Sequence, residues 1–326
     1  MTSTERRVQV DTYLTDEDLQ RGLREDVHRG LSAEPKVLPP KYFYDARGSE
    51  LFEDITRLPE YYPTRAERSI LERRAAEIAK LTSAHTLVEL GSGSSEKTHL
   101  LLRALQSEGS LQRYVPVDVS ESALRRAVGL IAGEYPNLQV HGVVADFEHH
   151  LSRLPGEGTR LVAFLGGTIG NFDPAQRHSF LCSVRAGMQP GDALLLGTDL
   201  VKDPARLVAA YDDGACVTAE FNRNVLRVIN RELDADFDPE TFEHVAVWDT
   251  QEEWIEMRLR TSSAQRVSVS ALDLEVGFEP GEEMRTEISA KFRQEKVEDE
   301  LGRAGLRLTE FWTDDAGDFA LSLAFA

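Results

Sequence analysis

The sequence predicts an α/β protein built on a Rossmann-like, mostly parallel sheet, and three observations carry this prediction. Short apolar runs of strand length alternate with amphipathic stretches of helix length between about residues 63 and 200. The first of these runs, 86–90, leads into a glycine-containing turn and a helix signal. Acidic residues end or follow the next two runs. With 326 residues, 41% of them hydrophobic, the chain is long enough for this core and one further lobe.

Composition excludes several classes of partner. The net charge of −19 argues against a nucleic-acid substrate, because the phosphate backbone would be repelled. No apolar run approaches the roughly 18 residues needed to span a membrane. Residues 1–14 lack the apolar segment of a signal peptide, and we expect them to form a loose tail. Cys182 and Cys216 fit no metal or redox spacing, so we expect a cytoplasmic protein with reduced cysteines and no metal.

The segment before the first strand is rich in aromatic residues. Apolar residues recur every four positions from Leu19 to Leu31 and predict a helix, which a proline-containing loop, 36–45, follows. After a short helix from Ser49, Thr64 and Glu67 match a capping box that opens a long helix. Five aromatic residues in these loops are expected to line a pocket as a group, although any one of them could instead fill the core: Tyr42, Phe43, Tyr44, Tyr61 and Tyr62.

The run 86–90 and the turn after it predict a nucleotide site. Gly91 and Gly93 allow a tight turn, and Ser94 or Ser95 can cap the next helix. A dinucleotide fingerprint would place a third glycine where this chain has Glu96. The acid at Glu89 and the polar loop therefore favour a cationic or zwitterionic ligand. This acid-x-Gly-x-Gly pattern resembles the first motif of the S-adenosylmethionine-dependent methyltransferases.

Two acidic residues at strand ends extend this site. Asp118 ends the run 114–118, 23 residues after Ser95, close to the spacing at which an acid binds ribose hydroxyls in a βαβ unit. Asp146 and Phe147 follow the run 138–144, where a carboxylate can accept from an adenine amine and the ring can cover the base. Each acid alone could be a helix cap. Their positions after successive strands favour cofactor binding.

The fourth strand, 161–165, leads into a loop that suits a small substrate. Three glycines in residues 166–172 let the backbone approach a ligand, and Asn171 offers both a donor and an acceptor, although it could be only a turn residue. The fifth strand is 193–197, and 306–313 with 319–325 close the sheet. Seven strands in this order are the class I methyltransferase topology. We expect a methyltransferase domain at 61–200 plus 287–326 and an α+β substrate-binding lobe at 15–60 plus 201–286.

The run 283–292 alternates with the period of a strand. If it is one regular strand, Arg285, Glu287 and Ser289 share one face, and Met284, Thr286 and Ile288 share the other. Glu287 could then bind a substrate, or it could be a solvated carboxylate paired with Lys291 or Arg285.

With these motifs in view, the sequence resembles the histidine Nα-methyltransferases of ergothioneine biosynthesis, from about Thr15 to Ala326. The motifs that carry the resemblance are LPPKYFYD, LFEDITRLPEYYPTR, VELGSGSSEKT, FLGGTIGNF, LLLGTDLVKD, AYDD, FNRNVL and EEMRTEIS. The resemblance implies transfer of three methyl groups from S-adenosylmethionine to the α-nitrogen of L-histidine, which gives hercynine. It implies these cofactor residues: Gly91, Lys97, Asp118, Asp146 and Phe147. It implies these substrate residues: Tyr44, Phe52, Tyr61, Gly166, Asn171, Tyr211, Met257, Glu287 and Ser289.

One position departs from the family's pattern, since the family commonly has serine where this chain has Gly167. Methyl transfer needs a neutral amine placed behind a sulfonium methyl, so positioning is the main task of the enzyme. We expect Tyr44 and Asn171 to be catalytic, Asn171 holding the carboxylate with Tyr61 or Tyr211. Glu287 and Ser289 can serve the imidazole. Faces of Tyr44 and Phe52 can accommodate the trimethylated cation.

Three alternatives remain open at this point. A methyltransferase for another small amine, such as tryptophan, would have no use for Glu287, because an indole has a single N–H. An oxidoreductase using NAD(P) is disfavoured by Glu96 in place of glycine. A non-catalytic binding module on the same fold is the third alternative. We expect a monomer whose partner is the small molecule L-histidine, without nucleic acid or membrane.

Overall fold

The computed structural model describes residues 7–92, 97–146, 151 and 157–326. The chain divides into two compact units. Unit 1 comprises Met1–Thr15, Arg65–Leu200 and Phe292–Ala326, and unit 2 comprises Asp16–Thr64 and Val201–Lys291. No helix in the described part of the chain is long and apolar enough to cross a membrane.

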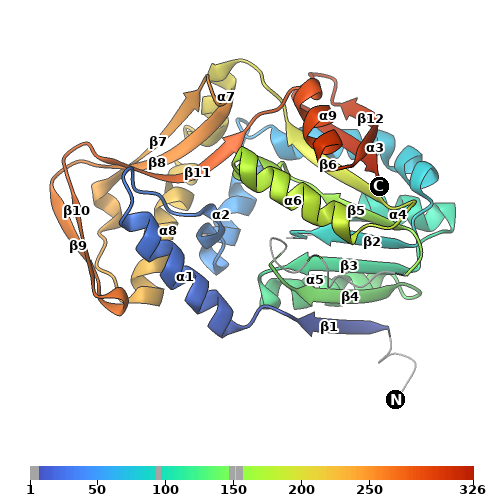
Figure 1. Cartoon of the computed structure of the whole chain (residues 1–326), viewed down its shortest axis with the longest axis horizontal. Coiled ribbons are helices and arrows are strands. Elements are labelled where there is room, and N and C mark those ends of the chain that lie inside the picture. Colours follow the sequence, from blue (N-terminus) through green and yellow to red (C-terminus); the bar gives the residue numbers. More distant parts are fainter. Residues whose placement is uncertain (1–6, 93–96, 147–150, 152–156) are drawn as a thin grey trace. The chain divides into compact units, whose positions relative to one another are not determined.

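Unit 1 contains an eight-stranded sheet with the order β1-β4-β3-β2-β5-β6-β13-β12 (Figure 1). β13 runs antiparallel to both of its neighbours, β6 and β12, and all other neighbouring pairs are parallel. The class I methyltransferase topology is therefore confirmed. The strands are β1 Val8–Thr12, β2 Thr86–Leu90, β3 Arg113–Asp118, β4 Gln139–Val144, β5 Arg160–Phe164, β6 Ala193–Asp199, β12 Arg307–Thr313 and β13 Phe319–Phe325.

The eighth strand comes from the segment that we expected to be a loose tail. Val8–Thr12 alternates apolar and polar residues and pairs in parallel with β4, from Val8 opposite Val140 to Thr12 opposite Val144. This pairing joins residues more than 130 positions apart, so the local pattern did not reveal it. The expectations of a tail and of seven strands are wrong for this segment.

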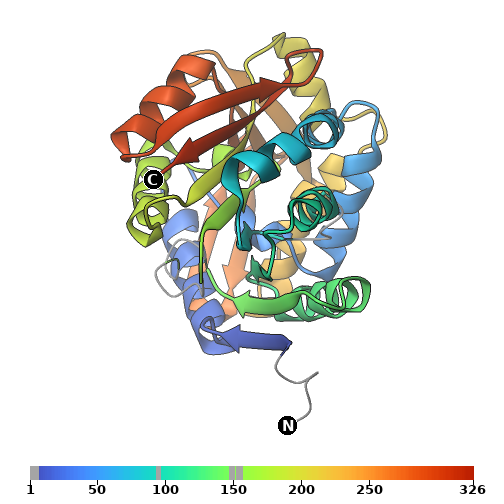
Figure 2. The ribbon, with the colours of Figure 1, turned by 90° about the vertical axis from the view of Figure 1, so that its right-hand side faces the viewer.

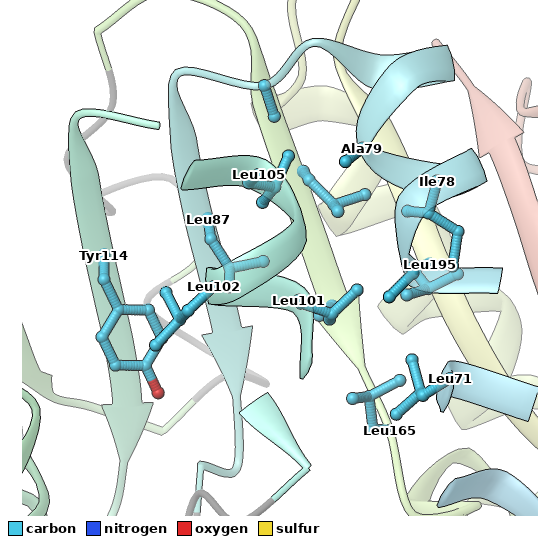
Figure 3. Close-up of a cluster of buried hydrophobic side chains, with 14 of the residues drawn as sticks. Leu71, Ile78, Ala79, Leu87, Leu101, Leu102, Leu105, Tyr114, Leu165 and Leu195 are labelled. Atoms are coloured by element: carbon cyan, nitrogen blue, oxygen red, sulfur yellow. The ribbon is translucent and has the colours of Figure 1, made fainter. Parts of the chain in front are cut away.

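Helices cover both faces of this sheet (Figure 2). Its helices are α3 Pro63–Thr82, α4 Thr98–Glu108, α5 Glu121–Glu134, α6 Pro174–Gly187 and α9 Gln294–Arg303, with a 3₁₀ turn η3 Thr168–Asn171. Leucine and isoleucine side chains of α3 and α4 pack on β2 and β3 (Figure 3). Because Leu87, Leu102, Leu105 and Tyr114 are fully buried, this core holds the glycine turn after β2 on a rigid support.

Unit 2 is an α+β unit with its own hydrophobic core. It contains a three-stranded antiparallel sheet, β11-β8-β7, and a hairpin, β9-β10. The strands are β7 Phe242–Asp249, β8 Trp254–Thr261, β9 Gln265–Val269, β10 Leu274–Phe278 and β11 Glu283–Ala290. The helices are α1 Asp16–Leu31, α2 Ala46–Arg57, α7 Pro204–Tyr211 and α8 Val217–Leu233, with 3₁₀ turns η1 Pro40–Phe43, η4 Pro239–Thr241 and η5 Ser270–Leu272.

The observed division differs from the expected domain limits near residues 61 and 287. We placed 61–200 and 287–326 with the methyltransferase domain, whereas residues 61–64 and 287–291 lie in unit 2. The reason for the second difference is that β11 is one strand of the three-stranded sheet as far as Ala290. Glu287 and Ser289 therefore share a unit with Tyr44, Phe52, Tyr61 and Tyr211.

Candidate active site

Three predicted cofactor residues lie at one edge of the sheet in unit 1. Gly91 has φ +70°, a conformation that favours glycine, and its N–H donates to Val117 O at 2.8 Å. Asp118 ends β3 opposite Val144 of β4, and Asp146 lies two residues after that strand's end. Because these strands are neighbours and parallel, Gly91 and both acids come to the same carboxyl edge.

The Asp118 carboxylate is oriented by the turn in which it lies. Its Oδ1 accepts a hydrogen bond from the N–H of Ser120 at 2.9 Å, which holds the side chain beside the start of α5. Gly93 and Phe147, which we expected to contact the cofactor, lie outside the described residues, as do Ser94, Ser95 and Glu96.

The carboxyl of Glu89 forms its hydrogen bonds within unit 1. Both of its oxygens accept from Thr98 Oγ1 at 2.7 Å, and Oε2 also accepts from the hydroxyl of Tyr114. Burial raises the pKa of Glu89 to about 7, although these two hydroxyl donors and the charge of Lys97 act in the opposite direction. The acid thus links β2 to the start of α4 and to β3, and fixes both sides of the glycine turn.

The sequence did not predict the contacts that Glu67 makes. Its side chain is fully buried, forms an ion pair with Lys97 and accepts from the N–H of Gly166 at 2.7 Å. We expected a capping box with Thr64, but α3 begins at Pro63 and the carboxylate serves these other partners. Glu67 therefore joins a predicted cofactor residue to the loop after β5.

That loop has a backbone that favours glycine at two positions. Gly166 and Gly167 have φ values of +78° and +70°, in the left-handed region. A Cβ on Gly166 would lie 3.9 Å from Lys97 Nζ, so the loop passes close to the lysine. A side chain at Gly167, where the family commonly has serine, would need this left-handed backbone and would contact Phe319 at 3.4 Å. Asn171 ends η3 and is half-buried.

These features fit an adenosine-type cofactor with a positive charge. The glycine turn has no side chain at Gly91, and a Cβ there would meet no atom of the described residues within 4 Å. Acids at two adjacent strand ends provide acceptors for ribose hydroxyls and a base amine. Two carboxylates at this edge are also compatible with the positive charge of a sulfonium.

Unit 2 contains an aromatic cluster made of four predicted substrate residues. The ring centroids of Tyr44 and Phe52 lie 5.5 Å apart, those of Phe52 and Tyr61 6.2 Å, and those of Tyr61 and Tyr211 6.3 Å. All three pairs meet edge to face, a favourable arrangement for aromatic rings. Phe221 of α8, absent from our predicted site, supports the cluster at 5.4 Å from Tyr44 and 5.9 Å from Phe52.

The other three loop aromatics have partners outside this cluster, and Phe43 fills the core, the alternative that was left open for any one of the five. Phe43 is fully buried in the core of unit 2. The hydroxyl of Tyr42 donates to Asp26 at 2.8 Å, and that of Tyr62 accepts from Lys202 at 2.7 Å. Spacing along a loop cannot distinguish these three from Tyr44 and Tyr61.

The hydroxyl of Tyr44 is crowded although the side chain is partly open. The residue is 40% exposed, yet its pKa is raised well above its usual value, first by desolvation and then by Glu287, Tyr61 and Tyr211. These two findings agree if the ring has one accessible side while its hydroxyl lies among other groups. An accessible aromatic face is what a bound cation requires.

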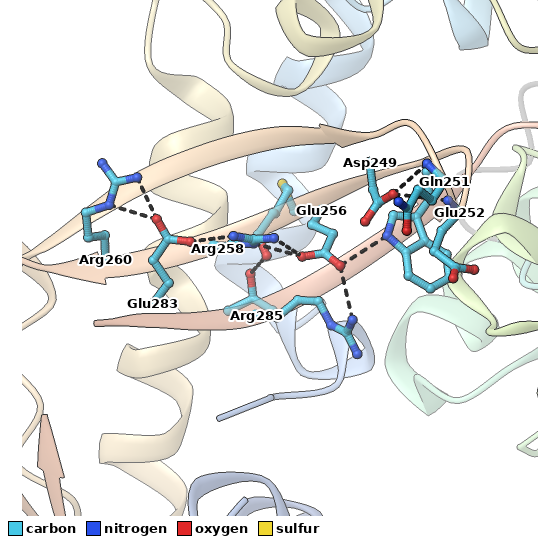
Figure 4. A network of polar contacts seen from close by, with 11 residues as sticks. Asp249, Gln251, Glu252, Glu256, Arg258, Arg260, Glu283 and Arg285 are labelled. Carbon is cyan, nitrogen blue, oxygen red and sulfur yellow. Dashed lines mark hydrogen bonds and ion pairs between the residues drawn. The ribbon is translucent and has the colours of Figure 1, made fainter. Parts of the chain in front are cut away.

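The two faces of β8 and β11 carry different chemistry. On one face, Glu256, Arg258, Arg260, Glu283 and Arg285 form a network of ion pairs (Figure 4). Directly paired residues of antiparallel strands share a face. Glu287 pairs with Met257 and Ser289 pairs with Ile255, so these four lie on the opposite, buried face.

A β-bulge at Thr286 produces this arrangement. Arg285 pairs with Arg258 but Glu287 pairs with Met257, so β11 has one extra residue there. Our expectation that Arg285 shares a face with Glu287 and Ser289 is therefore wrong. The bulge leaves Arg285 on the charged face and turns Glu287 to the buried one.

The bulge is held by a chain of buried hydrogen bonds. Thr286 Oγ1 donates to Asn222 Oδ1 at 2.6 Å and to Met257 O at 3.0 Å. Asn222 Nδ2 donates to His244 Nδ1 at 2.8 Å, and His244 Nε2 donates to Tyr211 O at 2.7 Å. Desolvation lowers the pKa of His244, which favours the neutral ring that this chain requires. The FNRNVL, AYDD and RTEIS motifs thus meet in one network.

Glu287 is buried without a hydrogen-bond partner among the described residues. It is 9% exposed, and burial raises the pKa of its carboxyl to about 7, while the charge of Lys291 lowers it. Arg285 pairs with Glu256. The alternative of a solvated surface carboxylate is therefore wrong. A buried acid of this kind is a common feature of functional sites.

Beside Glu287, three polar side chains form a compact triangle. Ser289 Oγ lies 2.7 Å from the hydroxyl of Tyr211, and Lys291 Nζ donates to both, at 2.8 Å and 3.0 Å. Lys291 is fully buried and was not among the predicted site residues. Its place two residues after Ser289 on a period-two pattern was the signal that could have found it.

The fold of unit 1 and its glycine turn, strand-end acids and adjacent loop define a class I S-adenosylmethionine-dependent methyltransferase. The family model described as histidine-specific, S-adenosylmethionine-dependent methyltransferase matches residues 23–326. The chain belongs to this family.

Curated relatives agree with this assignment. A histidine N-alpha-methyltransferase of Mycolicibacterium smegmatis is 60% identical over 96% of this chain and 97% of its own length. One of Mycobacterium tuberculosis is 58% identical over 98% of this chain and 99% of its own length. Ergothioneine biosynthesis protein 1 of Neurospora crassa is 35% identical over 60% of this chain, which corresponds to 23% of that longer protein.

Proposed function

We propose that this enzyme transfers three methyl groups from S-adenosylmethionine to the α-amino nitrogen of L-histidine, which gives hercynine for ergothioneine biosynthesis. The observation that carries the proposal is the buried carboxyl of Glu287, which has a hydroxyl, Ser289, beside it on the same strand face. The histidine-specific family and the names of the relatives support it.

The cofactor is assigned to residues of unit 1. Asp118 binds the ribose hydroxyls and Asp146 with Phe147 the adenine, while Gly91 provides a turn without a side chain. Lys97, oriented by Glu67, supports the loop that begins at Gly166. When bound, the cofactor supplies an electrophilic methyl group on its sulfonium and is released as S-adenosylhomocysteine.

The imidazole of histidine is assigned to Glu287 and Ser289. A neutral imidazole has one N–H donor and one acceptor nitrogen, so it needs an acceptor and a donor from the protein. The carboxylate of Glu287 accepts the N–H, and a charge-assisted bond of this type is about twice as strong as a neutral one. Met257, opposite Glu287, gives the ring an apolar contact. An apolar or indole side chain would leave the carboxylate unpaired.

The amino-acid end is assigned to polar and aromatic groups. Asn171 binds the carboxylate together with Tyr61 or Tyr211. The backbone of Gly166 allows close approach of the substrate. After three transfers the nitrogen is a cation without N–H groups, and the faces of Tyr44 and Phe52 stabilise it through cation–π contacts. The enzyme is proposed to work as a monomer in the cytoplasm. Light scattering of the purified protein measures its mass in solution and so tests whether it is a monomer.

Mass spectrometry of L-histidine incubated with the enzyme and excess S-adenosylmethionine tests the proposal. We expect species with one, two and three added methyl groups, and trimethylhistidine at the end. L-tryptophan under the same conditions is the comparison substrate. No methylated histidine, or faster methylation of tryptophan, would contradict the proposed substrate.

A second arm tests the aromatic cluster. Tyr44→Leu should slow the third transfer more than the first, because the product cation then lacks an aromatic face. Tyr42→Phe is the control, since Tyr42 bonds to Asp26 outside the cluster. A wild-type enzyme that stops at monomethylhistidine would show that the cluster does not serve the cation.

A further inference from the structure

Lys291 is a fully buried lysine whose Nζ contacts two of the proposed substrate residues. It donates to Ser289 Oγ at 2.8 Å and to the Tyr211 hydroxyl at 3.0 Å. A lysine ammonium has three donors and no acceptor, so both oxygens act as acceptors toward it. Burying this side chain costs conformational entropy and the solvation of its charge, so its contacts must offset both costs.

Donor and acceptor strength indicate which hydroxyl hydrogen, that of Ser289 or that of Tyr211, remains available for a ligand. Ser289 Oγ and the Tyr211 hydroxyl are 2.7 Å apart, so one of them donates to the other. The distance allows either hydroxyl to be the donor; because a phenol is the stronger donor and an alcohol oxygen the better acceptor, we assign Tyr211 as the donor to Ser289. Ser289 then accepts from both Lys291 and Tyr211, which occupies its two lone pairs. Its own hydrogen is the one that can point to a ligand.

We propose that Lys291 is a specificity-determining positioning residue that makes the Ser289 hydroxyl a hydrogen-bond donor to the acceptor nitrogen of the substrate imidazole. Glu287, on the same strand face, accepts the N–H of the other ring nitrogen. Together they select one neutral tautomer of the ring. This inference rests on the proposed function and adds to it a residue outside the predicted site.

The electrostatics of the site agree with this arrangement. The charge of Lys291 lowers the pKa of the Glu287 carboxyl, which burial alone would raise further. Lys291 thereby favours the ionised acceptor at one ring nitrogen and a fixed donor at the other. One buried cation thus acts on both polar partners of the ring.

The first test is Lys291→Met, which keeps the apolar stem and removes the donor. We expect the KM for histidine to rise about tenfold, because the serine hydroxyl is then free to rotate, while kcat at saturating histidine changes less than about twofold. Affinity for S-adenosylmethionine, measured by calorimetry, should be unchanged. Lys80→Met, on the exposed face of α3, is the matched control.

The second test is a double-mutant cycle with Ser289→Ala. If Lys291 acts through Ser289, Lys291→Met should add little to the KM of the Ser289→Ala variant, so the two effects should not be additive. Fully additive effects, or an unchanged KM in Lys291→Met, would overturn the inference. Lys291→Gln is a second variant in case the methionine destabilises the fold.

Two outcomes separate this inference from the proposed function. A wild-type enzyme that leaves histidine unmethylated would contradict the function itself. A wild-type enzyme that methylates histidine, with both Lys291 variants unfolded by circular dichroism, would show that the lysine is structural and that the inference is wrong.

Discussion

Two buried carboxyl groups, one in each unit, have the same raised pKa and opposite surroundings. Glu89 in unit 1 and Glu287 in unit 2 both have a pKa of about 7, mainly because of burial. Glu89 accepts hydrogen bonds from Thr98 and Tyr114. Glu287 has no such bond among the described residues. The carboxyl of Glu89 is satisfied by the fold, whereas that of Glu287 is available for a ligand.

The comparison shows why a raised pKa alone does not identify a site. Burial disfavours the ionised form of both acids, so the shift reports the surroundings and not the role. The hydrogen-bond partners distinguish them. In unit 1 the cofactor is proposed to bind at Gly91 and the strand-end acids and not at Glu89. In unit 2 the substrate imidazole is proposed to bind to the buried acid itself, Glu287.

The largest expected effect concerns the cofactor residues of unit 1. Asp118→Ala should weaken S-adenosylmethionine binding by about 1.5–3 kcal/mol, because a hydrogen bond to a charged group is lost. Isothermal calorimetry measures it, with Asp315→Ala, an exposed acid, as the control. Unchanged affinity would remove Asp118 from the ribose site.

A second experiment compares the two buried acids by stability. In the folded state Glu287 binds a proton more tightly than in the unfolded state, so its contribution to stability is lost as the pH rises from about 4.5 through about 7. Glu287→Gln should therefore raise the free energy of unfolding at pH 8 by up to about 3 kcal/mol and leave it nearly unchanged at pH 4.

Glu89→Gln should give a smaller gain in the free energy of unfolding at pH 8. An amide accepts fewer of the hydrogen bonds from Thr98 and Tyr114, and this loss offsets the benefit of removing the charge. Urea unfolding at both pH values measures the two variants, with the exposed Glu275→Gln as control. Equal gains at pH 8 for both substitutions would contradict the distinction drawn between the two acids.

The third prediction concerns substrate binding at Glu287. Glu287→Ala should raise the KM for histidine at least about tenfold, some 1.4 kcal/mol of lost binding, without changing affinity for S-adenosylmethionine. It should also narrow the preference for histidine over amino acids with apolar aromatic side chains. Steady-state kinetics with both substrates measure it. A variant with the wild-type KM and preference would show that the imidazole is bound elsewhere.

The smallest effect is expected at the bulge. Thr286→Val removes the hydroxyl that donates to Asn222 and to Met257 O, and should reduce the free energy of unfolding by about 1 kcal/mol. Thr56→Val is the control, because Thr56 is half-buried on α2 and bonds only locally to Glu53 O among the described contacts. A loss no larger than that of the control would show that the hydroxyl does not hold the bulge.

Much of unit 1 could be predicted because its signals are local. A short apolar run, a glycine turn and an acid at the strand end are readable within a few residues, and they located β2, β3, β4 and the acids. The edge strand β1 was missed because its partner lies far along the chain. The capping-box pattern at Thr64 also concealed the actual partners of Glu67, Lys97 and Gly166.

Unit 2 was predicted less well because its chemistry depends on long-range register. Tyr44 and Tyr61 lie in one aromatic cluster, but Tyr42, Phe43 and Tyr62, close to them in the sequence, have partners outside it. The period-two pattern of 283–292 gave the correct strand and the wrong partner for Arg285, because a bulge cannot be recognised from alternation. Lys291 was considered only as an ion-pair partner of Glu287.

The bulge at Thr286 determines which side chains of β11 lie on each face of the sheet, independently of which residues the strand contains. A strand shifted by one residue exchanges its two faces. Deleting Thr286 would therefore remove the bulge and leave Glu287 opposite Met257, whereas deleting Ile288 would move Ser289 opposite Glu256, toward the charged face. The evolution of new amino-acid preferences on this scaffold can thus proceed by insertion or deletion in β11 as well as by substitution, and a comparison of lengths in this strand is as informative as a comparison of residue identities.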